Sequence, residues 1–153
     1  MNEPDFRRTF ILKYIKGKKV LDLGVGDLTY RSLHPFIAKH ASSVVGVELD
    51  SERSQRLREK GFNVKTADVE TLSLGEKFDV VVAGDLIEHL NNPGLFLQTV
   101  LKHLKKDGIF ICNTPNIYSF NFVLRGLFCG GNVPHFHEHT VGYTEGLLKE
   151  LFR

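Results

Sequence analysis

The chain has 153 residues, of which 42% are hydrophobic and 25% charged, and its formal net charge is +2. This length predicts one domain with a core that needs no disulfide or metal, and the composition excludes wholesale disorder. The mild charge does not favour nucleic-acid binding, and no apolar run is long enough to cross a membrane. The first residues lack the apolar core of a secretion signal, and two cysteines are too few for a disulfide framework, so we expect a cytoplasmic protein.

The first half of the chain alternates between helical and strand patterns. Apolar residues at helical spacing predict a helix over Phe6–Ile15. The apolar run Lys18–Val25, which ends in glycines, predicts a buried strand. The next expected elements, in chain order, are a helix, a strand, a helix capped by Ser51 and a third strand, over Leu28–Ala41, Ser43–Asp50, 51–61 and Asn63–Val69.

The second half continues the same alternation. Phe78–Gly84 is the most strongly apolar segment and predicts a fourth strand. Asn92 is the expected N-cap of a helix that has Pro93 in its first turn and stops at Gly108, before a fifth strand over Gly108–Asn113. The residues expected on the apolar face of this helix are Leu95, Phe96, Val100, Leu101 and Leu104. Apolar strands alternating with helices predict an α/β fold in which a doubly wound parallel sheet is covered on both faces.

Two glycines follow the first expected strand, in the string Asp22-Leu23-Gly24-Val25-Gly26-Asp27. Glycine lets a ligand approach the backbone closely, and open parallel sheets bind ligands at the carboxyl ends of their strands. The string is no phosphate loop, and a dinucleotide fingerprint would need a glycine at Thr29. Because two aspartates flank a turn that holds no basic residue, a ligand with a cationic centre is favoured over a pyrophosphate. S-adenosylmethionine fits, since it has a sulfonium, an ammonium and no phosphate; a tight turn without any ligand is the alternative.

Glu48 lies at the end of the second expected strand. An acid at this place accepts hydrogen bonds from two ribose hydroxyls. This serves NAD and S-adenosylmethionine equally, so it indicates a nucleoside rather than one particular cofactor. Asp50 is the nearest competitor for the role, and an ordinary surface acid is the other interpretation.

Five sequence motifs follow one another along the chain: Asp22-x-Gly24-x-Gly26, "GVELD", "TADVE", "FDVVVAGDLIEHL" and "LKHLKKDGIFICNTPN". Together they resemble the class I S-adenosylmethionine-dependent methyltransferases, and most closely the broad group that includes the ubiquinone-biosynthesis O-methyltransferases. The resemblance covers roughly Val20–Arg153. It implies a Rossmann-like sheet of seven strands in the order 3-2-1-4-5-7-6.

The last string of the chain, "YTEGLLKELFR", resembles the helix just before the sixth strand of that sheet. We therefore expect one methyltransferase domain over residues 1–153 with the strand order 3-2-1-4-5, in which strands six and seven are missing. The fifth strand would then be a bare edge, which invites pairing with another chain. We expect a homodimer through this edge, cover by the segment Ile117–Phe128, or a truncated product.

The resemblance also implies a role for each matching residue. At the nucleoside end, Glu48 would hold the ribose diol with Leu49 beside the adenine, while Asp68 would accept from the adenine amino group and Val69 would donate its backbone N–H. Asp22 would help to hold the methionine ammonium. The full set expected around the methionine and the sulfonium is Asp22, Gly24, Gly26, Gly84, Asp85 and Leu86.

The implied reaction is an in-line displacement that moves the methyl group to an oxygen or nitrogen of a small-molecule acceptor. The sulfonium is already activated, so the protein mainly aligns the acceptor and excludes water. Candidates for the general base are His89, Asp85 and His139, in that order. One alternative is a remnant that binds the cofactor without turnover, and another, disfavoured by Asp22, is a nicotinamide-dependent oxidoreductase.

Two features near the C-terminus stay open. The apolar segment Asn116–Gly131 is expected to form a wall of the acceptor pocket, with plain core or a partner surface as alternatives. His135, His137 and His139 alternate and would share one face of an extended segment. No further ligand cluster accompanies them, so we expect no metal site. A role for His139 in acceptor binding is favoured over a metal, and ordinary surface histidines are the other interpretation.

Overall fold

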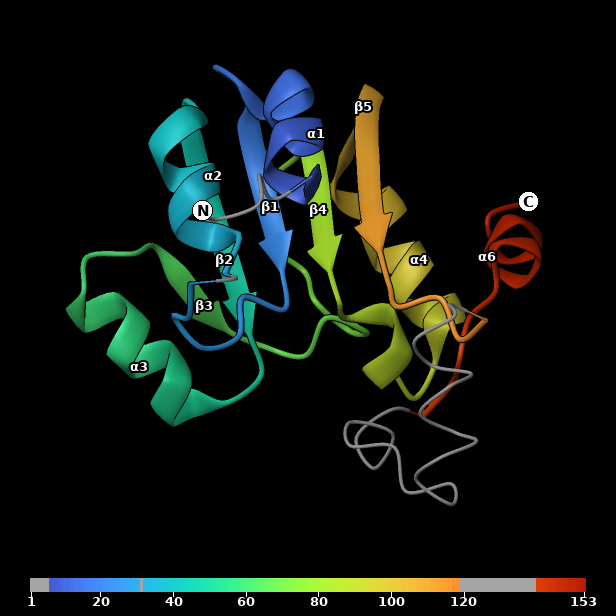
Figure 1. Cartoon of the computed structure of the whole chain (residues 1–153). Helices are drawn as coiled ribbons and strands as arrows, with labels where there is room; N and C mark the ends of the chain where they lie inside the picture. The colour runs from blue at the N-terminus through green and yellow to red at the C-terminus, as the bar shows by residue number, and fades with distance from the viewer. Residues whose placement is uncertain (1–5, 31, 119–139) are drawn as a thin grey trace, which may run out of the picture.

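A computed structural model describes residues 6–30, 32–118 and 140–153. Five parallel strands form one sheet in the order β3-β2-β1-β4-β5, as the sequence predicts (Figure 1). The strands are β1 (Lys19–Leu23), β2 (Ser43–Glu48), β3 (Val64–Thr66), β4 (Phe78–Gly84) and β5 (Leu104–Asn113). Because all five run in the same direction, their carboxyl ends meet at one edge of the sheet.

Helices cover both faces of the sheet (Figure 1). One face carries α1 (Phe6–Ile15), α2 (His34–His40) and α3 (Ser51–Glu59), and the other carries α4 (Pro93–His103). The alternation of side chains along β1 produces these two layers. Val20 packs in the cluster with α1 and α2, whereas Leu21 and Leu23 pack in the cluster with α4.

The helix expected over Leu28–Ala41 is much shorter, because α2 begins only at His34. Pro35 lies in the first turn of α2, where its missing N–H breaks no helical hydrogen bond. The residues before it form a turn in which Ser32 N–H donates to the Thr29 carbonyl at 3.1 Å. The prediction of one long helix through the proline was therefore wrong at its N-terminal end.

The start of α3 also differs from the expectation. Its N-cap is Asp50 and not Ser51, because the Asp50 carboxylate accepts from the backbone N–H of Arg53 at 2.9 Å. The third strand is shorter than the expected Asn63–Val69, since only Val64–Thr66 pair with β2.

The helix before β5 ends at His103 rather than at Gly108. Leu104 already pairs with Phe78 of β4, and a register shift between Phe78 and Val80 lets the ladder continue, so β5 begins at Leu104. The buried face of α4 differs from the expected one and consists of Phe96, Thr99, Val100 and His103. Leu95 and Leu101 are instead 41% and 70% exposed.

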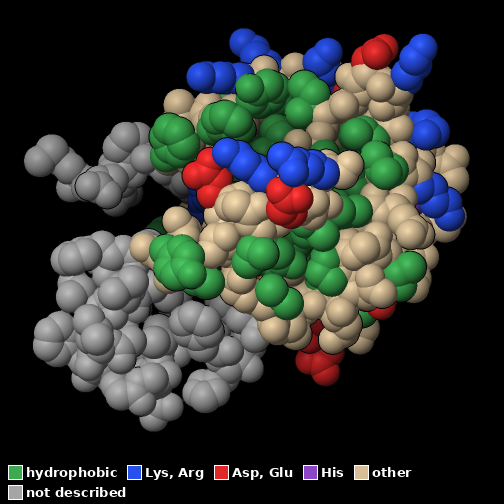
Figure 2. Space-filling model, turned by 90° about the vertical axis from the view of Figure 1, so that its right-hand side faces the viewer, with side chains coloured by type: hydrophobic (Ala, Val, Ile, Leu, Met, Phe, Trp, Pro, Cys, Tyr) green, Lys and Arg blue, Asp and Glu red, His purple; other side chains and the backbone are tan. Residues whose placement is uncertain are grey.

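The far end of the sheet is apolar and open. Among the described strands, β5 pairs with β4 alone, as expected of an edge strand. A cavity of about 610 Å³ lies between α4, β5 and the C-terminal helix α6 (Glu145–Leu151), and its apolar lining includes Leu101, Leu104, Phe110 and Phe152. Figure 2 shows hydrophobic side chains gathered on this face. Cover by a second copy stays a prediction, and most of the segment Ile117–Phe128 lies outside the described residues.

Within the part of the chain that the structure describes, no helix combines the length and the apolar character needed to cross a membrane.

Candidate functional site

The residues predicted to bind the cofactor gather around two cavities at the carboxyl edge of the sheet. The larger has a volume of about 400 Å³ and the smaller about 190 Å³. Gly24, Gly26 and Asp85 line both cavities, so the two adjoin. Every residue predicted to bind the cofactor lines at least one of them: Glu48, Leu49, Asp68, Val69 and Leu86 the larger, and Asp22 and Gly84 the smaller.

The glycine turn after β1 brings backbone close to the loop after β4. Gly24 and Gly26 have φ angles of +73° and +65°, which favour glycine over every other residue. A Cβ atom at Gly24 would lie 2.7 Å from Cδ1 of Leu86. The turn therefore needs glycine at position 24 for its space as well as for its backbone conformation.

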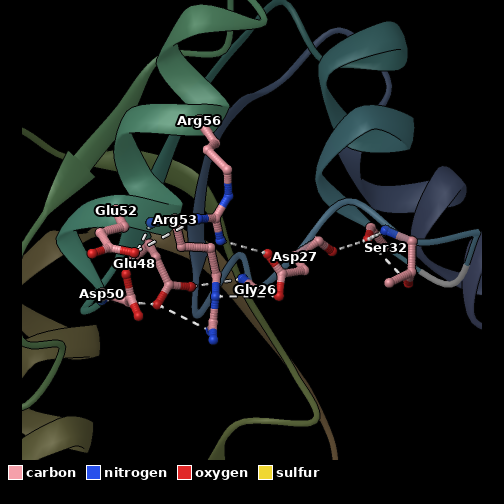
Figure 3. Close-up of polar contacts among 9 residues, drawn as sticks. Gly26, Asp27, Ser32, Glu48, Asp50, Glu52, Arg53 and Arg56 are labelled. Atoms are coloured by element: carbon pink, nitrogen blue, oxygen red, sulfur yellow. Dashed lines mark hydrogen bonds and ion pairs between the residues drawn. The ribbon is translucent and has the colours of Figure 1, made fainter.

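Glu48 is held in place by backbone N–H groups on both sides (Figure 3). Its Oε2 atom accepts from Gly26 N–H at 2.8 Å, and its Oε1 atom accepts from Asp50 N–H at 3.0 Å. The side chain is almost fully buried yet lines the larger cavity. Asp50, the alternative ribose acceptor, serves instead as the cap of α3, and the hydrogen bond from Arg53 N–H lowers the pKa of its carboxyl group below the usual value.

Arg53 is a residue of the larger cavity that sequence reasoning missed. Its Nη1 atom lies 3.5 Å from Oε1 of Glu48, and its Nε atom lies 3.5 Å from Oδ2 of Asp27 (Figure 3). Arg56 also pairs with Asp27, at 3.3 Å. The negative charge of Asp27 is thus compensated by α3, although the turn itself holds no basic residue. The electrostatic argument for a cationic ligand therefore rests on the other carboxylates that line the two cavities, such as that of Asp22.

Asp85 directly follows β4 and has the strained φ angle of +49°. Its Oδ2 atom accepts from Nη1 of Arg7 at 2.6 Å, and its Oδ1 atom accepts from Nδ2 of Asn113 at 2.6 Å. Arg7 lines the smaller cavity but stands 78 residues away in the chain, so no local pattern predicts it.

Asp22 lies in β1 and is almost completely buried. Its Oδ2 atom is 2.8 Å from Nδ1 of His34, the first residue of α2, whose side chain is fully buried. Both residues line the smaller cavity. That cavity therefore contains the carboxylates of Asp22 and Asp85 and the guanidinium of Arg7.

Comparison with known proteins identifies the family. The profile of a methyltransferase-domain family matches residues 4–150, nearly the whole chain. The chain belongs to this methyltransferase-domain family.

One similar relative is the ubiquinone biosynthesis O-methyltransferase of Pelagibacter ubique, 28% identical over 130 residues, which are 80% of this chain and 53% of the relative. The YcgJ protein of Bacillus subtilis shares the fold, with a TM-score of 0.74 at 19% identity over 97% of this chain and 67% of its own. A coclaurine N-methyltransferase solved with N-methylheliamine and S-adenosylhomocysteine matches with a TM-score of 0.55 at 25% identity, over 72% of this chain and 37% of its own. The chain spans about half the length of the curated relatives that it matches.

In this methyltransferase domain, the short 3-10 helix η1 (Ile87–His89) follows the fourth strand. His89 is exposed and lines the larger cavity. Its neighbour Glu88 is buried, and its Oε2 atom accepts from the Thr114 hydroxyl at 2.9 Å. The carbonyl oxygen of Glu88 accepts from Thr140 N–H at 2.8 Å, so η1 ties the end of β5 to the C-terminal segment.

Burial and nearby acidic groups raise the pKa values of two side chains, those of Cys112 and Tyr143. Burial, followed by the charges of Glu88 and Asp85, raises the pKa of the Cys112 thiol to about 12. Burial also raises the pKa of Tyr143, and its neighbours Cys112 and Glu88 add to that effect. Neither group is a sensible general base or nucleophile near neutral pH.

Several predicted features lie outside the described residues. They are the three alternating histidines, His139 among them, and all of Asn116–Gly131 beyond residue 118. Where the structure does describe the chain, His, Cys, Asp and Glu side chains nowhere gather in a group of three suited to a metal ion.

Proposed function

We propose that this chain binds S-adenosylmethionine in the two adjoining cavities and transfers its methyl group to a small-molecule acceptor. The observation that carries the proposal is the distribution of charge: a buried carboxylate faces the larger cavity, and two carboxylates and a guanidinium line the smaller. A nucleoside joined to a zwitterionic amino acid has the complementary chemistry. Membership of the methyltransferase-domain family supports the same assignment.

At the nucleoside end, Glu48 would accept hydrogen bonds from the ribose hydroxyls. Each carboxylate oxygen has two lone pairs. Oε2 accepts from Gly26 N–H alone and keeps acceptor capacity. Oε1 accepts from Asp50 N–H and, at 3.5 Å, from Nη1 of Arg53, so a ribose hydroxyl would take the place of that long contact. Asp68 and Val69, which follow β3, would contact the adenine, and Leu49 is 68% exposed and supplies an apolar surface for the ring.

At the amino-acid end, Arg7 would bind the carboxylate of the ligand while Asp22 attracts its ammonium, with Asp85 close to the methionine. An arginine suits a carboxylate because its planar fork donates two parallel hydrogen bonds. Arg7 already pairs with Asp85 at 2.6 Å, so it would contact both carboxylates or exchange one for the other.

When bound, S-adenosylmethionine supplies a methyl group on a positively charged sulfur. The chain then has to align the acceptor in line with this group, exclude water and, for a hydroxyl acceptor, remove a proton. His89 is the foremost candidate for the proton acceptor because it is exposed to the larger cavity. Asp85 is a weaker one, since Arg7 and Asn113 already engage its two oxygens; His139 stays the third candidate.

We propose a small molecule with an oxygen or nitrogen nucleophile as the acceptor. The similar proteins include an O-methyltransferase of ubiquinone biosynthesis and an N-methyltransferase of coclaurine, so proteins similar to this chain act on both kinds of nucleophile. Neither name assigns the acceptor of this chain.

The proposal is tested by calorimetric titration with S-adenosylhomocysteine, and with NAD as the control ligand. We expect micromolar binding of the former and none of the latter. Glu48→Ala should abolish this binding, whereas Asp50→Ala, which changes the competing acid two residues away, should retain it. Absence of binding by the folded chain, or equal binding of NAD, would refute the proposal. Binding without methyl transfer to any acceptor would favour a non-catalytic remnant.

A further inference from the structure

The two carboxylates of the smaller cavity have different partners. Asp85 is paired with Arg7, a permanent cation, at 2.6 Å. Asp22 is paired with the imidazole of His34, at 2.8 Å between Oδ2 and Nδ1. The side chains of Asp22 and His34 are 5% and 0% exposed, so this second pair is shielded from water.

The hydrogen bonds of His34 indicate which nitrogen carries the proton. Nδ1 faces a carboxylate and must donate to it. Nε2 is buried and has no hydrogen-bond partner among the described residues. A second proton on Nε2 would find no acceptor, which is costly in a buried place. These hydrogen-bond contacts fit a neutral imidazole that carries its proton on Nδ1.

A neutral donor affects its carboxylate in a different way from a cation. It fixes the position of Asp22 through one hydrogen bond but leaves the negative charge of Asp22 uncompensated. Arg7, in contrast, balances the charge of Asp85. Asp22 is thus the carboxylate of this cavity that retains its attraction for a cationic ligand group.

The neighbouring strand leaves room for the imidazole. A Cβ atom at Gly46 of β2 would lie 2.7 Å from Cε1 of His34 and 2.7 Å from Cγ2 of Val25. On the other side, the His34 ring meets the edge of Phe62 with ring centroids 5.2 Å apart. The absence of a side chain at position 46 thus leaves space for the ring beside Asp22 and for Val25 of the glycine turn.

We propose that His34 is a positioning residue, which orients Asp22 as an uncompensated carboxylate for the ammonium of the bound amino-acid group. This role rests on the proposed function, which it deepens at the amino-acid end of the site. It assigns His34 no contact with the ligand, because the imidazole acts through Asp22.

Two variants of nearly equal shape separate this role from simple packing. Asparagine can place an amide N–H close to where Nδ1 donates, whereas leucine has the same branching and no donor. The ligands are S-adenosylhomocysteine, which carries the ammonium, and 5′-methylthioadenosine, which lacks the amino-acid group. Both are titrated into the full chain and into each variant by calorimetry.

For His34→Leu we expect about tenfold weaker binding of S-adenosylhomocysteine, the usual effect of one hydrogen bond to a charged group. Binding of 5′-methylthioadenosine should stay within about twofold, because its contacts do not involve Asp22. His34→Asn should restore most of the lost affinity. An equal loss for both ligands, no loss for either, or a failure of the asparagine variant to restore binding would overturn the proposal.

Gly46→Ala provides an independent test should the leucine variant not fold. The added methyl group would meet Val25 of the glycine turn as closely as the ring, so this variant is read beside Asp22→Asn, which keeps the shape of Asp22 and removes its charge. The selective loss is expected in Asp22→Asn, and a loss shared by both ligands in that variant would overturn the proposal. A folded unmodified chain that binds neither ligand would refute the proposed function itself. Binding of both ligands without selectivity in the variants would refute the role of His34 alone.

Discussion

The loops after β1, β2 and β3 and the loops after β4 and β5 form two halves of one site, and a buried glutamate in each half shows how they differ. Glu48, in the β1–β3 half, accepts from backbone N–H groups through both of its oxygens. Glu88, in the β4–β5 half, accepts from the Thr114 hydroxyl through Oε2, while its Oε1 atom is buried without a partner among the described residues. Both oxygens of the first carboxylate thus have a partner in the fold, whereas only one oxygen of the second has a partner among the described residues.

The two halves of the site differ in the contacts that hold their acidic side chains. In the β1–β3 half, backbone donors at the strand ends hold the ribose-binding candidate Glu48, although side chains of α2 and α3 pair with Asp22 and Asp27. The β4–β5 half depends on side chains from distant segments, such as Arg7 on Asp85 and Thr140 on the carbonyl of Glu88. We therefore expect changes in the first half to act on the nucleoside site directly, and changes in the second to act through packing.

The largest expected effect lies where the two halves touch, at Gly24 and Leu86. Gly24→Ala places a methyl group 2.7 Å from Cδ1 of Leu86 in a left-handed backbone conformation. Overpacking and a left-handed backbone each cost about 1–3 kcal/mol, so the free energy of unfolding should fall clearly in urea denaturation. Gly61→Ala is the control, because Gly61 has a φ angle of +87° but nothing within 4 Å, so only the backbone strain applies there. Equal stability losses in the two variants would contradict the contact between the halves.

A smaller effect is expected on the reactivity of the Cys112 thiol, which lies on β5 and therefore probes the β4–β5 half. With a pKa of about 12 instead of 9.0, its thiolate fraction near pH 8 is lower by about a thousandfold, and the higher nucleophilicity of the thiolate recovers part of this. Alkylation by iodoacetamide should therefore be about fiftyfold slower in the folded chain than in urea. A Cys129→Ser variant leaves Cys112 as the single thiol.

The same pKa gives a direction for stability. Because the folded state raises the pKa of Cys112, the unfolded chain loses this proton first as the pH rises. The contribution of the thiol is complete below about pH 9 and is lost as the pH rises towards about 12. Urea unfolding at pH 8 and pH 10 should show lower stability at pH 10, and a smaller decrease in Cys112→Ala. An unchanged decrease in that variant would mean that other groups cause it.

The two halves also differ in how far the sequence predicts them. The strand order was implied by the resemblance to the methyltransferases. The gathering of Asp22, Glu48 and Asp68 at one edge follows from local strings, because each acid stands at or next to the end of an apolar strand in the chain. The start of α2 and the cap of α3 were misplaced within these same segments. Pro35 lies in the first turn of α2, and Asp50 caps α3. The spacing of apolar residues alone does not show that these two residues mark the helix starts.

The sequence does not predict ion pairs and hydrogen bonds between side chains from different segments of the chain. Arg7 on Asp85, Arg53 on Asp27 and His34 on Asp22 join residues that only the folded sheet brings together. Gly46 offered one local signal, since a glycine inside an apolar strand indicates a close approach by another group. That signal predicts a neighbour but does not identify the imidazole. The start of β5 at Leu104 likewise depends on its pairing with Phe78.

The smallest expected effect is that of Glu88→Gln, which is measured beside Glu48→Gln to test the difference between the two glutamates directly. In Glu48→Gln, the new amide nitrogen faces either Gly26 N–H or Asp50 N–H, so one donor meets another donor. The free energy of unfolding should fall by about 1–3 kcal/mol, the cost of a buried polar group left unsatisfied. In Glu88→Gln, the amide oxygen can still accept from Thr114, and the amide nitrogen takes the place of the unpartnered oxygen. Removing a buried charge that has a single hydrogen bond should therefore change the free energy of unfolding by less than about 1 kcal/mol. Urea denaturation of both variants measures the difference, and a loss in Glu88→Gln as large as that in Glu48→Gln would show that the β4–β5 half is held as tightly as the β1–β3 half.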